Sequence, residues 1–209
     1  MPFKLSPFKA FEQSSYKNLK GFHLSPSSCK PQSWDSHFEK KHLLVMDFDP
    51  ECISYATQVI SFPVPGITER YTPDAVCIYS GNRVLLKEFK PKAKLTQKLD
   101  YKYKAIEQYI EDNTNWSFEL VTEEAFNNTQ IKNFMKLKVH FRWDKNEVLQ
   151  FLLQNGKLLD LVTNVGAIQQ APITQQEKFY LWAGVAYRFG LIDFNSLITA
   201  RTPINWSVV

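Results

Sequence analysis

A predicted β-hairpin in the first half of the chain constrains the fold more than any other stretch. Its two strands, 74–79 and 83–90, are separated by Ser80-Gly81-Asn82, and glycine and asparagine are residues that tight hairpin turns favour. A three-residue loop pairs Tyr79 with Arg83, and this pair fixes the register of the whole hairpin.

This register places two acidic side chains face to face. Counting outward from the turn, Asp74 lies opposite Glu88, and Lys90 shares the face of Glu88 because side chains alternate along a strand. Facing carboxylates repel, so the arrangement makes sense if a cation sits between them. The alternative interpretation is a pair of ordinary solvated strand ends, and a two-residue loop would remove the pairing altogether.

Composition restricts the class of protein. The chain has 209 residues, of which 44% are hydrophobic and 22% charged, and this predicts a folded globular protein. A formal net charge of +4 tolerates nucleic acid as a partner without requiring it. The cysteines, Cys29, Cys52 and Cys77, lack the paired spacing of zinc or redox motifs. No apolar run is long enough for a membrane helix or a signal peptide, so we expect a soluble cytoplasmic protein without membrane contact.

Residues 1–33 form a basic N-terminal arm, in which five lysines accompany a single acid, Glu12. Two interpretations stay open. The arm packs its aromatic residues on the following domain, or it contacts phosphates or a protein partner through its lysines.

The next domain is predicted over residues 34–141. A helix over 34–48 is capped by Ser33 or Asp35, carries Glu39 near its start and packs through His42. A strand near 57–62 and the hairpin follow, and then a helix over 96–112 and a strand over 118–121. This order predicts an α/β domain with a mixed sheet flanked by helices.

The helix that follows the hairpin is basic at its start. Lysines in such a position commonly point into solvent, but they could also contact a phosphate backbone beside the hairpin. The candidate DNA contacts are Lys92, Lys94, Lys98 and Lys102.

Residues 142–209 are predicted to form a small, mostly helical C-terminal domain. A capping Asp144 begins a helix over 144–154, and Thr174 with Glu177 begins another over 174–189. Two short segments near 191–199 and 203–206 could pair as a hairpin, which would give the domain a winged-helix-like end.

An early helical glutamate, Pro-Asp on one strand and Glu-x-Lys on the next resemble the PD-(D/E)xK nuclease fold, which is the restriction-endonuclease-like fold. The resemblance narrows to the TnsA family, the endonuclease subunits of heteromeric bacterial transposases. The matching residues are Ser36-x-x-Glu39, Asp47-Phe48-Asp49-Pro50, Gln58, Tyr71-Thr72-Pro73-Asp74, Glu88-Phe89-Lys90-Pro91 and Thr122-Glu123-Glu124.

The resemblance implies a magnesium site, in which manganese would substitute. It makes Glu39, Asp74 and Glu88 both catalytic residues and metal ligands, with the main-chain carbonyl of Phe89 as a further ligand. It also implies that Lys90 orients the attacking water or stabilises charge at the phosphate.

The resemblance further implies a role in cut-and-paste DNA transposition. The family's subunit hydrolyses the non-transferred strand at the 5′ ends of the transposon, beside a DDE-type transposase and an AAA+ ATPase regulator. The C-terminal domain is then the expected docking surface for the regulator. Two alternatives stay open: another restriction-like or junction nuclease, and a catalytically inactive DNA-binding assembly subunit.

Overall fold

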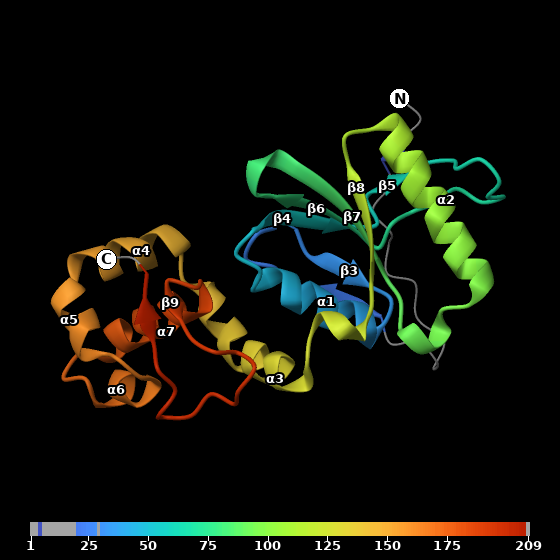
Figure 1. The fold of residues 1–209 in the computed structure, drawn as a ribbon. Helices are drawn as coiled ribbons and strands as arrows, with labels where there is room; N and C mark the ends of the chain where they lie inside the picture. Colours follow the sequence, from blue (N-terminus) through green and yellow to red (C-terminus); the bar gives the residue numbers. More distant parts are fainter. Residues whose placement is uncertain (1–3, 6–19, 29, 208–209) are drawn as a thin grey trace. The chain divides into compact units, whose positions relative to one another are not determined.

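The computed structural model describes residues 4–5, 20–28 and 30–207, and these form two compact units, Met1–Ala125 and Phe126–Val209. The first unit is a mixed α/β domain whose sheet is flanked by helices, as predicted (Figure 1). The described part of the chain contains no helix that is both long and apolar enough to cross a membrane.

The central sheet has four strands in the order β4-β6-β7-β8. β4 (Cys52–Thr57), β6 (Ala75–Tyr79) and β7 (Arg83–Phe89) are antiparallel neighbours. β8 (Ser117–Val121) runs parallel to β7, which requires the long crossover that a helix between them provides.

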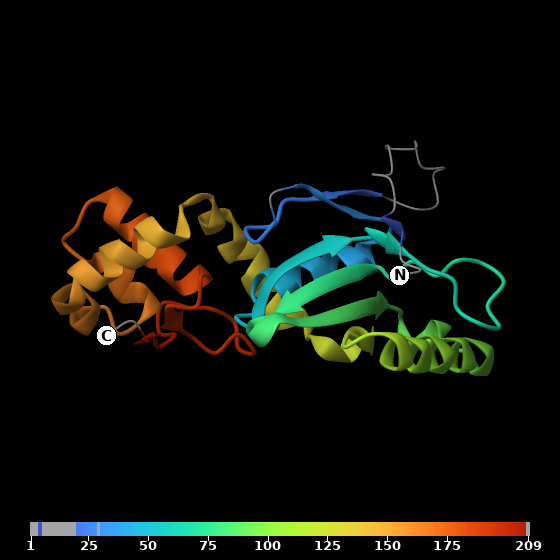
Figure 2. The same cartoon turned by 90° about the horizontal axis from the view of Figure 1, so that it is seen from above.

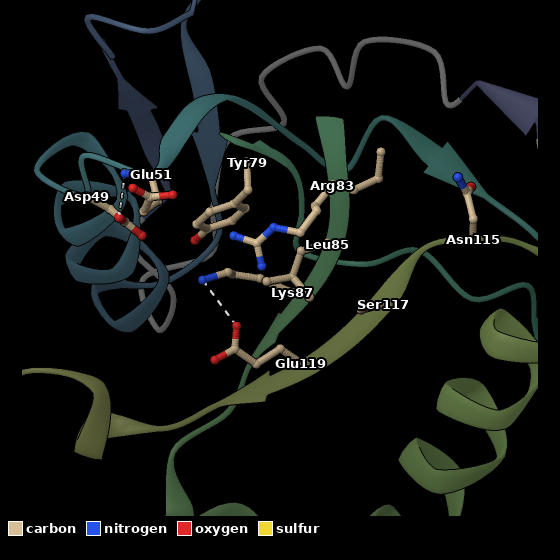
Figure 3. A pocket seen from close by; sticks show the side chains of 10 residues that line it. Asp49, Glu51, Tyr79, Arg83, Leu85, Lys87, Asn115, Ser117 and Glu119 are labelled. Atoms are coloured by element: carbon tan, nitrogen blue, oxygen red, sulfur yellow. Dashed lines mark hydrogen bonds and ion pairs between the residues drawn. The ribbon is translucent and has the colours of Figure 1, made fainter. Parts of the chain in front are cut away.

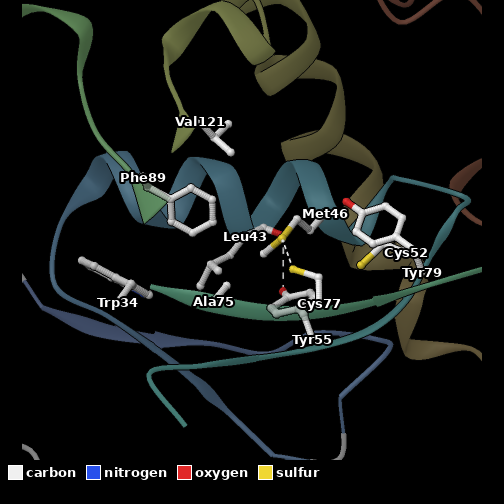
Figure 4. Close-up of a cluster of buried hydrophobic side chains, with 10 residues drawn as sticks. All are labelled: Trp34, Leu43, Met46, Cys52, Tyr55, Ala75, Cys77, Tyr79, Phe89 and Val121. Atoms are coloured by element: carbon white, nitrogen blue, oxygen red, sulfur yellow. Dashed lines mark hydrogen bonds between the residues drawn. The ribbon is translucent and has the colours of Figure 1, made fainter. Parts of the chain in front are cut away.

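Two helices cover opposite faces of this sheet (Figure 2). α1 (His37–Asp47) buries Leu43 and Met46 against Ala75 and Cys77, and Figure 4 shows this cluster. α2 (Gln97–Asn113) is the crossover helix, and it packs Ile106 and Ile110 in a second cluster with Leu86. Alternation along β7 therefore sends successive side chains into two different cores.

Two boundaries in this unit differ from the sequence prediction. Ser36, rather than Ser33 or Asp35, caps α1, and its hydroxyl accepts a hydrogen bond from the backbone N–H of Glu39. The strand expected near 57–62 was misplaced: the sheet strand β4 ends at Thr57, and only the two-residue β5 (Ile60–Ser61) lies in the expected range. Gln58, which adopts a left-handed backbone conformation with φ of 52°, separates the two.

The predicted N-terminal arm lies mostly outside the described residues. Its described end belongs to the first unit: β2 (Gly21–His23) pairs with β3 (Gln32–Trp34), while β1 (Lys4–Leu5) pairs with β5. The buried side chains of His23 and Asp47 bond to each other and so tie β2 to the end of α1.

The second unit is mostly helical, as predicted, but it begins earlier than residue 142. α3 (Asn128–Leu137) and the 3₁₀ helix η4 (Lys138–Arg142) belong to it. The amide of Asn133 donates to the carbonyls of Phe194 and Ser196, so α3 is anchored within this unit. Its capping box uses Asn127 and Gln130, a weaker sequence signal than the Thr-x-x-Glu pattern that predicts the helix beginning at Thr174.

The remaining elements are α4 (Lys145–Gln154), α5 (Gly156–Leu161), α6 (Val165–Gln170), α7 (Gln175–Ala186), β9 (Gly190–Leu191) and β10 (Asn205–Trp206). α4 and α7 begin at the predicted caps, Asp144 and Thr174, whereas α5 and α6 were not predicted. α7 ends at Ala186 rather than Phe189, since the chain turns at Arg188 with φ of 67°. β9 and β10 pair antiparallel, which confirms a small hairpin but with only two residues in each strand.

The two-core arrangement predicts which residues of the hairpin carry the stability of the first unit. Leu86 is fully buried under α2, so Leu86→Ala is expected to lower the free energy of unfolding by about 2–5 kcal/mol. Ile78 on the adjacent strand is 39% exposed, and Ile78→Ala should cost about 1 kcal/mol or less. Chemical denaturation followed by circular dichroism measures both, and equal losses would contradict the assignment of the core.

Candidate active site

The hairpin has the predicted register. Tyr79 pairs with Arg83 across Ser80-Gly81-Asn82, where Gly81 and Asn82 take left-handed φ values of 77° and 59°. The ladder continues to Ala75 opposite Lys87, which brings the next residues, Asp74 and Glu88, level with each other.

The carboxylate of Asp74 is hydrogen-bonded to the backbone of the opposite strand. The backbone N–H of Phe89 donates a hydrogen bond of 2.8 Å to Oδ2 of Asp74. The side chain of Phe89 points to the α1 face instead, where its ring lies parallel to that of His42 at 4.6 Å. Only main-chain atoms of Phe89 therefore face the site, as the sequence predicts, and His42 is a packing residue, also as predicted.

Glu88 is buried, with 8% of its surface exposed, yet it is surrounded by polar partners. The hydroxyl of Tyr71 donates to Oε2 at 2.9 Å, and the hydroxyl of Tyr103 donates to Oε1 at 3.0 Å. Nζ of Lys90 lies 3.5 Å from Oε1, which confirms that Lys90 shares the face of Glu88.

The electrostatics of Asp74 reflect this crowding of acids. Burial, followed by repulsion from Glu88 and Glu39, raises the pKa of Asp74 from 3.8 to about 8. The hydrogen bond from Phe89 and the charge of Lys90 act in the opposite direction without cancelling the rise. Asp74 is therefore a carboxyl group that a nearby cation would ionise.

Glu39 lies close enough to act on Asp74 electrostatically, but its carboxylate is engaged at the start of α1. Oε2 accepts from the backbone N–H of Asp35 at 2.7 Å, and Oε1 accepts from the hydroxyl of Ser36 at 2.8 Å. Burial raises the pKa of Glu39, and these two hydrogen bonds lower it in part. The carboxylate of Glu39 is thus held by Asp35 and Ser36 at the N-terminus of α1.

Asp35 and Gln58 also lie near this site, although no catalytic role was predicted for either residue. The side-chain amide of Gln58 lies 3.4 Å from Oδ2 of Asp35, and its backbone N–H donates to the carbonyl of Asp74 at 3.2 Å. A left-handed, non-glycine residue beside the site was not foreseeable, because β4 gave no signal of a break at this position.

The four candidate DNA-contact lysines surround the start of α2 but differ in environment. Nζ of Lys92 pairs with Oε1 of Glu124 at 2.6 Å. Lys94 and Lys98 are exposed, whereas the ammonium of Lys102 lies 6.0 Å from the ring centre of Tyr71. Lys94 and Lys98 are thus the members of this set most open to a phosphate backbone.

A groove of about 610 Å³ lies at the other end of the hairpin, beside the turn (Figure 3). Tyr79, Arg83 and Lys87 line it together with acidic side chains, among them Glu119, which pairs with Lys87. It contains none of the predicted site residues, so it is distinct from the carboxylate site.

The donor chemistry at the open end of the hairpin fits a hard divalent cation. Asp74 and Glu88 supply carboxylate oxygens, which Mg²⁺ prefers, and a bound cation would relieve the repulsion that raises the pKa of Asp74. Within the described residues, no three His, Cys, Asp or Glu side chains are grouped as a ready metal site. The structure brings Asp74, Glu88 and Lys90 together and leaves Glu39 at their edge, facing the helix start.

No family model matches the chain, and no curated protein matches it.

The raised pKa of Asp74 makes a prediction about stability and pH. Its folded-state pKa exceeds its unfolded value, so the folded protein binds the extra proton and its stability falls as pH rises from about 4 to 8. Asp74→Asn removes that proton equilibrium. The variant should gain roughly 2–5 kcal/mol relative to wild type between pH 4 and pH 8, as measured by denaturation at each pH. Glu69→Gln, an exposed substitution in the same unit, is the control, and a pH-independent difference for Asp74→Asn would contradict the assignment.

Proposed function

We propose that this protein is a magnesium-dependent DNA endonuclease that hydrolyses phosphodiester bonds. The observation that carries the proposal is the meeting of Asp74, Glu88 and Lys90 at the open end of the β6–β7 hairpin. Two facing carboxylates beside a lysine, on a helix–three-strand–helix–strand domain, are also the pattern that resembles the PD-(D/E)xK nucleases.

The chain's residues have distinct roles in this proposal. Asp74 and Glu88 would hold the cation, assisted by the main-chain carbonyl of Phe89, and Glu39 would join them on releasing its hydrogen bonds to Asp35 and Ser36. Bound magnesium would polarise the scissile phosphate and activate water, leaving a 3′-hydroxyl and a 5′-phosphate. The ammonium of Lys90, fixed by its 3.5 Å contact with Glu88, would orient the attacking water or stabilise charge on the phosphate.

The resemblance to TnsA supports a specific biological setting. In this proposal the chain is the transposase subunit that cuts the non-transferred strand at the 5′ ends of a transposon, beside a DDE-type transposase and an AAA+ regulator. Residues 1–125 contain sixteen basic and sixteen acidic residues, whereas residues 126–209 contain nine basic and five acidic ones. A unit without net charge has little intrinsic affinity for DNA, which suits an enzyme that is delivered to its substrate by partners.

One observation favours a second candidate function, a catalytically inactive assembly subunit. Both carboxylate oxygens of Glu39 accept hydrogen bonds at the start of α1, so this glutamate already has a structural role. In a nuclease, the carboxylates of Asp74 and Glu88 are needed for cutting DNA. In an inactive assembly subunit, they would serve only the fold.

Cleavage of transposon-end DNA with Mg²⁺ and the partner transposase separates the two functions. Asp74→Ala and Lys90→Ala are each expected to reduce the cleavage rate by about 10²-fold or more, because each removes a group at the reacting phosphate. The strand that bears the 5′ end of the transposon should be cut with wild type and not with Asp74→Ala, which gel mapping of the labelled strands would show.

Lys41→Ala is the matched control for Lys90→Ala, since Lys41 is exposed on α1 and belongs to no part of the site. Its cleavage rate should equal that of wild type. If the Asp74 variant cut as fast as wild type, the carboxylates would not be catalytic, and the nuclease proposal would be wrong.

The exposed lysines at the start of α2 make a separate prediction about DNA affinity. Lys94→Ala combined with Lys98→Ala should weaken DNA binding and lower the slope of log K against log salt by about two, one for each lost phosphate contact. Binding titrations over a range of salt concentrations measure this slope. An unchanged slope would mean that these lysines point into solvent without touching DNA.

A further inference from the structure

We propose that Tyr71 and Tyr103 are positioning residues that hold the carboxylate of Glu88 in its metal-binding orientation. The inference rests on the proposed nuclease function and extends it to two residues outside the predicted ligand set.

The contact geometry carries the proposal. One phenol reaches each carboxylate oxygen of Glu88, Tyr71 to Oε2 at 2.9 Å and Tyr103 to Oε1 at 3.0 Å. Each oxygen of an ionised carboxylate accepts more than one hydrogen bond, so Oε2 keeps capacity for a further partner, while Oε1 also faces the ammonium of Lys90 at 3.5 Å. Two donors on two different oxygens fix the rotation of the carboxylate plane, which a single donor would leave free.

The two tyrosines come from separate and well-anchored elements. Tyr71 is 4% exposed and pairs through its backbone with Phe62, in both directions, at 2.8 and 3.0 Å. Tyr103 is 4% exposed and lies in α2, among the core residues that pack on the sheet. Because both anchors are buried, neither phenol has freedom to follow a moving carboxylate.

Packing alone does not explain a carboxylate at position 88. Removing a carboxylate from water costs several kcal/mol, and an apolar side chain of similar volume is often as stable or more stable at such a site. A buried, doubly held acid at the end of a strand is instead the usual arrangement around a metal ligand, where outer hydrogen-bond partners orient the donor.

The two phenol hydroxyls of Tyr71 and Tyr103 that hold Glu88, called the tyrosine clamp or clamp below, also connect the carboxylate site with the candidate DNA-binding helix. Lys102 precedes Tyr103 in α2, and its ammonium lies 6.0 Å from the ring centre of Tyr71. The start of α2, where Lys98 is exposed, therefore belongs to the same helix that fixes Glu88.

Titration calorimetry with Mn²⁺ on the full chain tests the clamp without relying on activity. The double variant Tyr71→Phe/Tyr103→Phe keeps both rings and removes both hydroxyls. Its Kd for Mn²⁺ should rise by about 10–100-fold, which is the usual effect of losing the outer partners of a metal ligand. In cleavage assays at low fixed Mn²⁺, kcat should fall while KM for DNA stays within about twofold, and raising Mn²⁺ should restore kcat. A smaller folded fraction would instead lower kcat at every metal concentration.

Tyr55→Phe is the matched control, because it removes an equally buried hydroxyl that donates to another carboxylate, Asp47, at 2.8 Å. It should lower thermal stability and leave Mn²⁺ affinity unchanged. If the double variant does not fold, Tyr103→Phe alone is used, with an expected several-fold rise in Kd.

The outcomes separate the clamp from the nuclease proposal. Wild-type affinity in the tyrosine variants, together with lost binding in Asp74→Ala, would overturn the clamp and leave the metal site standing. Equal Mn²⁺ binding by wild type and Asp74→Ala, or no binding by wild type, would overturn the metal site and the clamp with it.

Discussion

The register of one hairpin is the constraint on which the candidate site depends. The left-handed Gly81 and Asn82 allow a three-residue turn, and that turn pairs Tyr79 with Arg83. Because side chains alternate along a strand, a slip of one residue would send Glu88 to the α1 face and Phe89 to the α2 face. The two cores oppose such a slip, since Leu86 and Phe89 fill different clusters on the two faces.

The same pleat gives the two facing acids different environments. The carboxylate of Glu88 accepts hydrogen bonds from two phenol hydroxyls and lies near the ammonium of Lys90, so side chains compensate its charge. Asp74 receives one backbone N–H, and burial together with neighbouring acids raises its pKa to about 8. A pair of carboxylates that differ in this way is typical of sites where a cation or a proton completes the charge balance.

The prediction of the fold succeeded where the signal was local. Turn residues, caps and alternation located the hairpin, α2, β8, α4 and the start of α7 within a few residues. It was wrong where the signal depended on context: α3 begins with an asparagine–glutamine capping box, and its burial depends on contacts from Asn133 to residues about 60 positions later. The boundary between the units moved accordingly, from the predicted residue 142 to Phe126.

The sequence by itself determined which acids face each other, because turn length and the period of two are properties of the local chain. Only the tertiary structure decided what each acid bonds to. Glu39 faces the start of its own helix, and Glu88 is held by Tyr103, fifteen residues away on a helix whose packing no local pattern specifies. Hydrogen bonds between side chains of separate elements depend on how those elements pack, so they follow from the complete core.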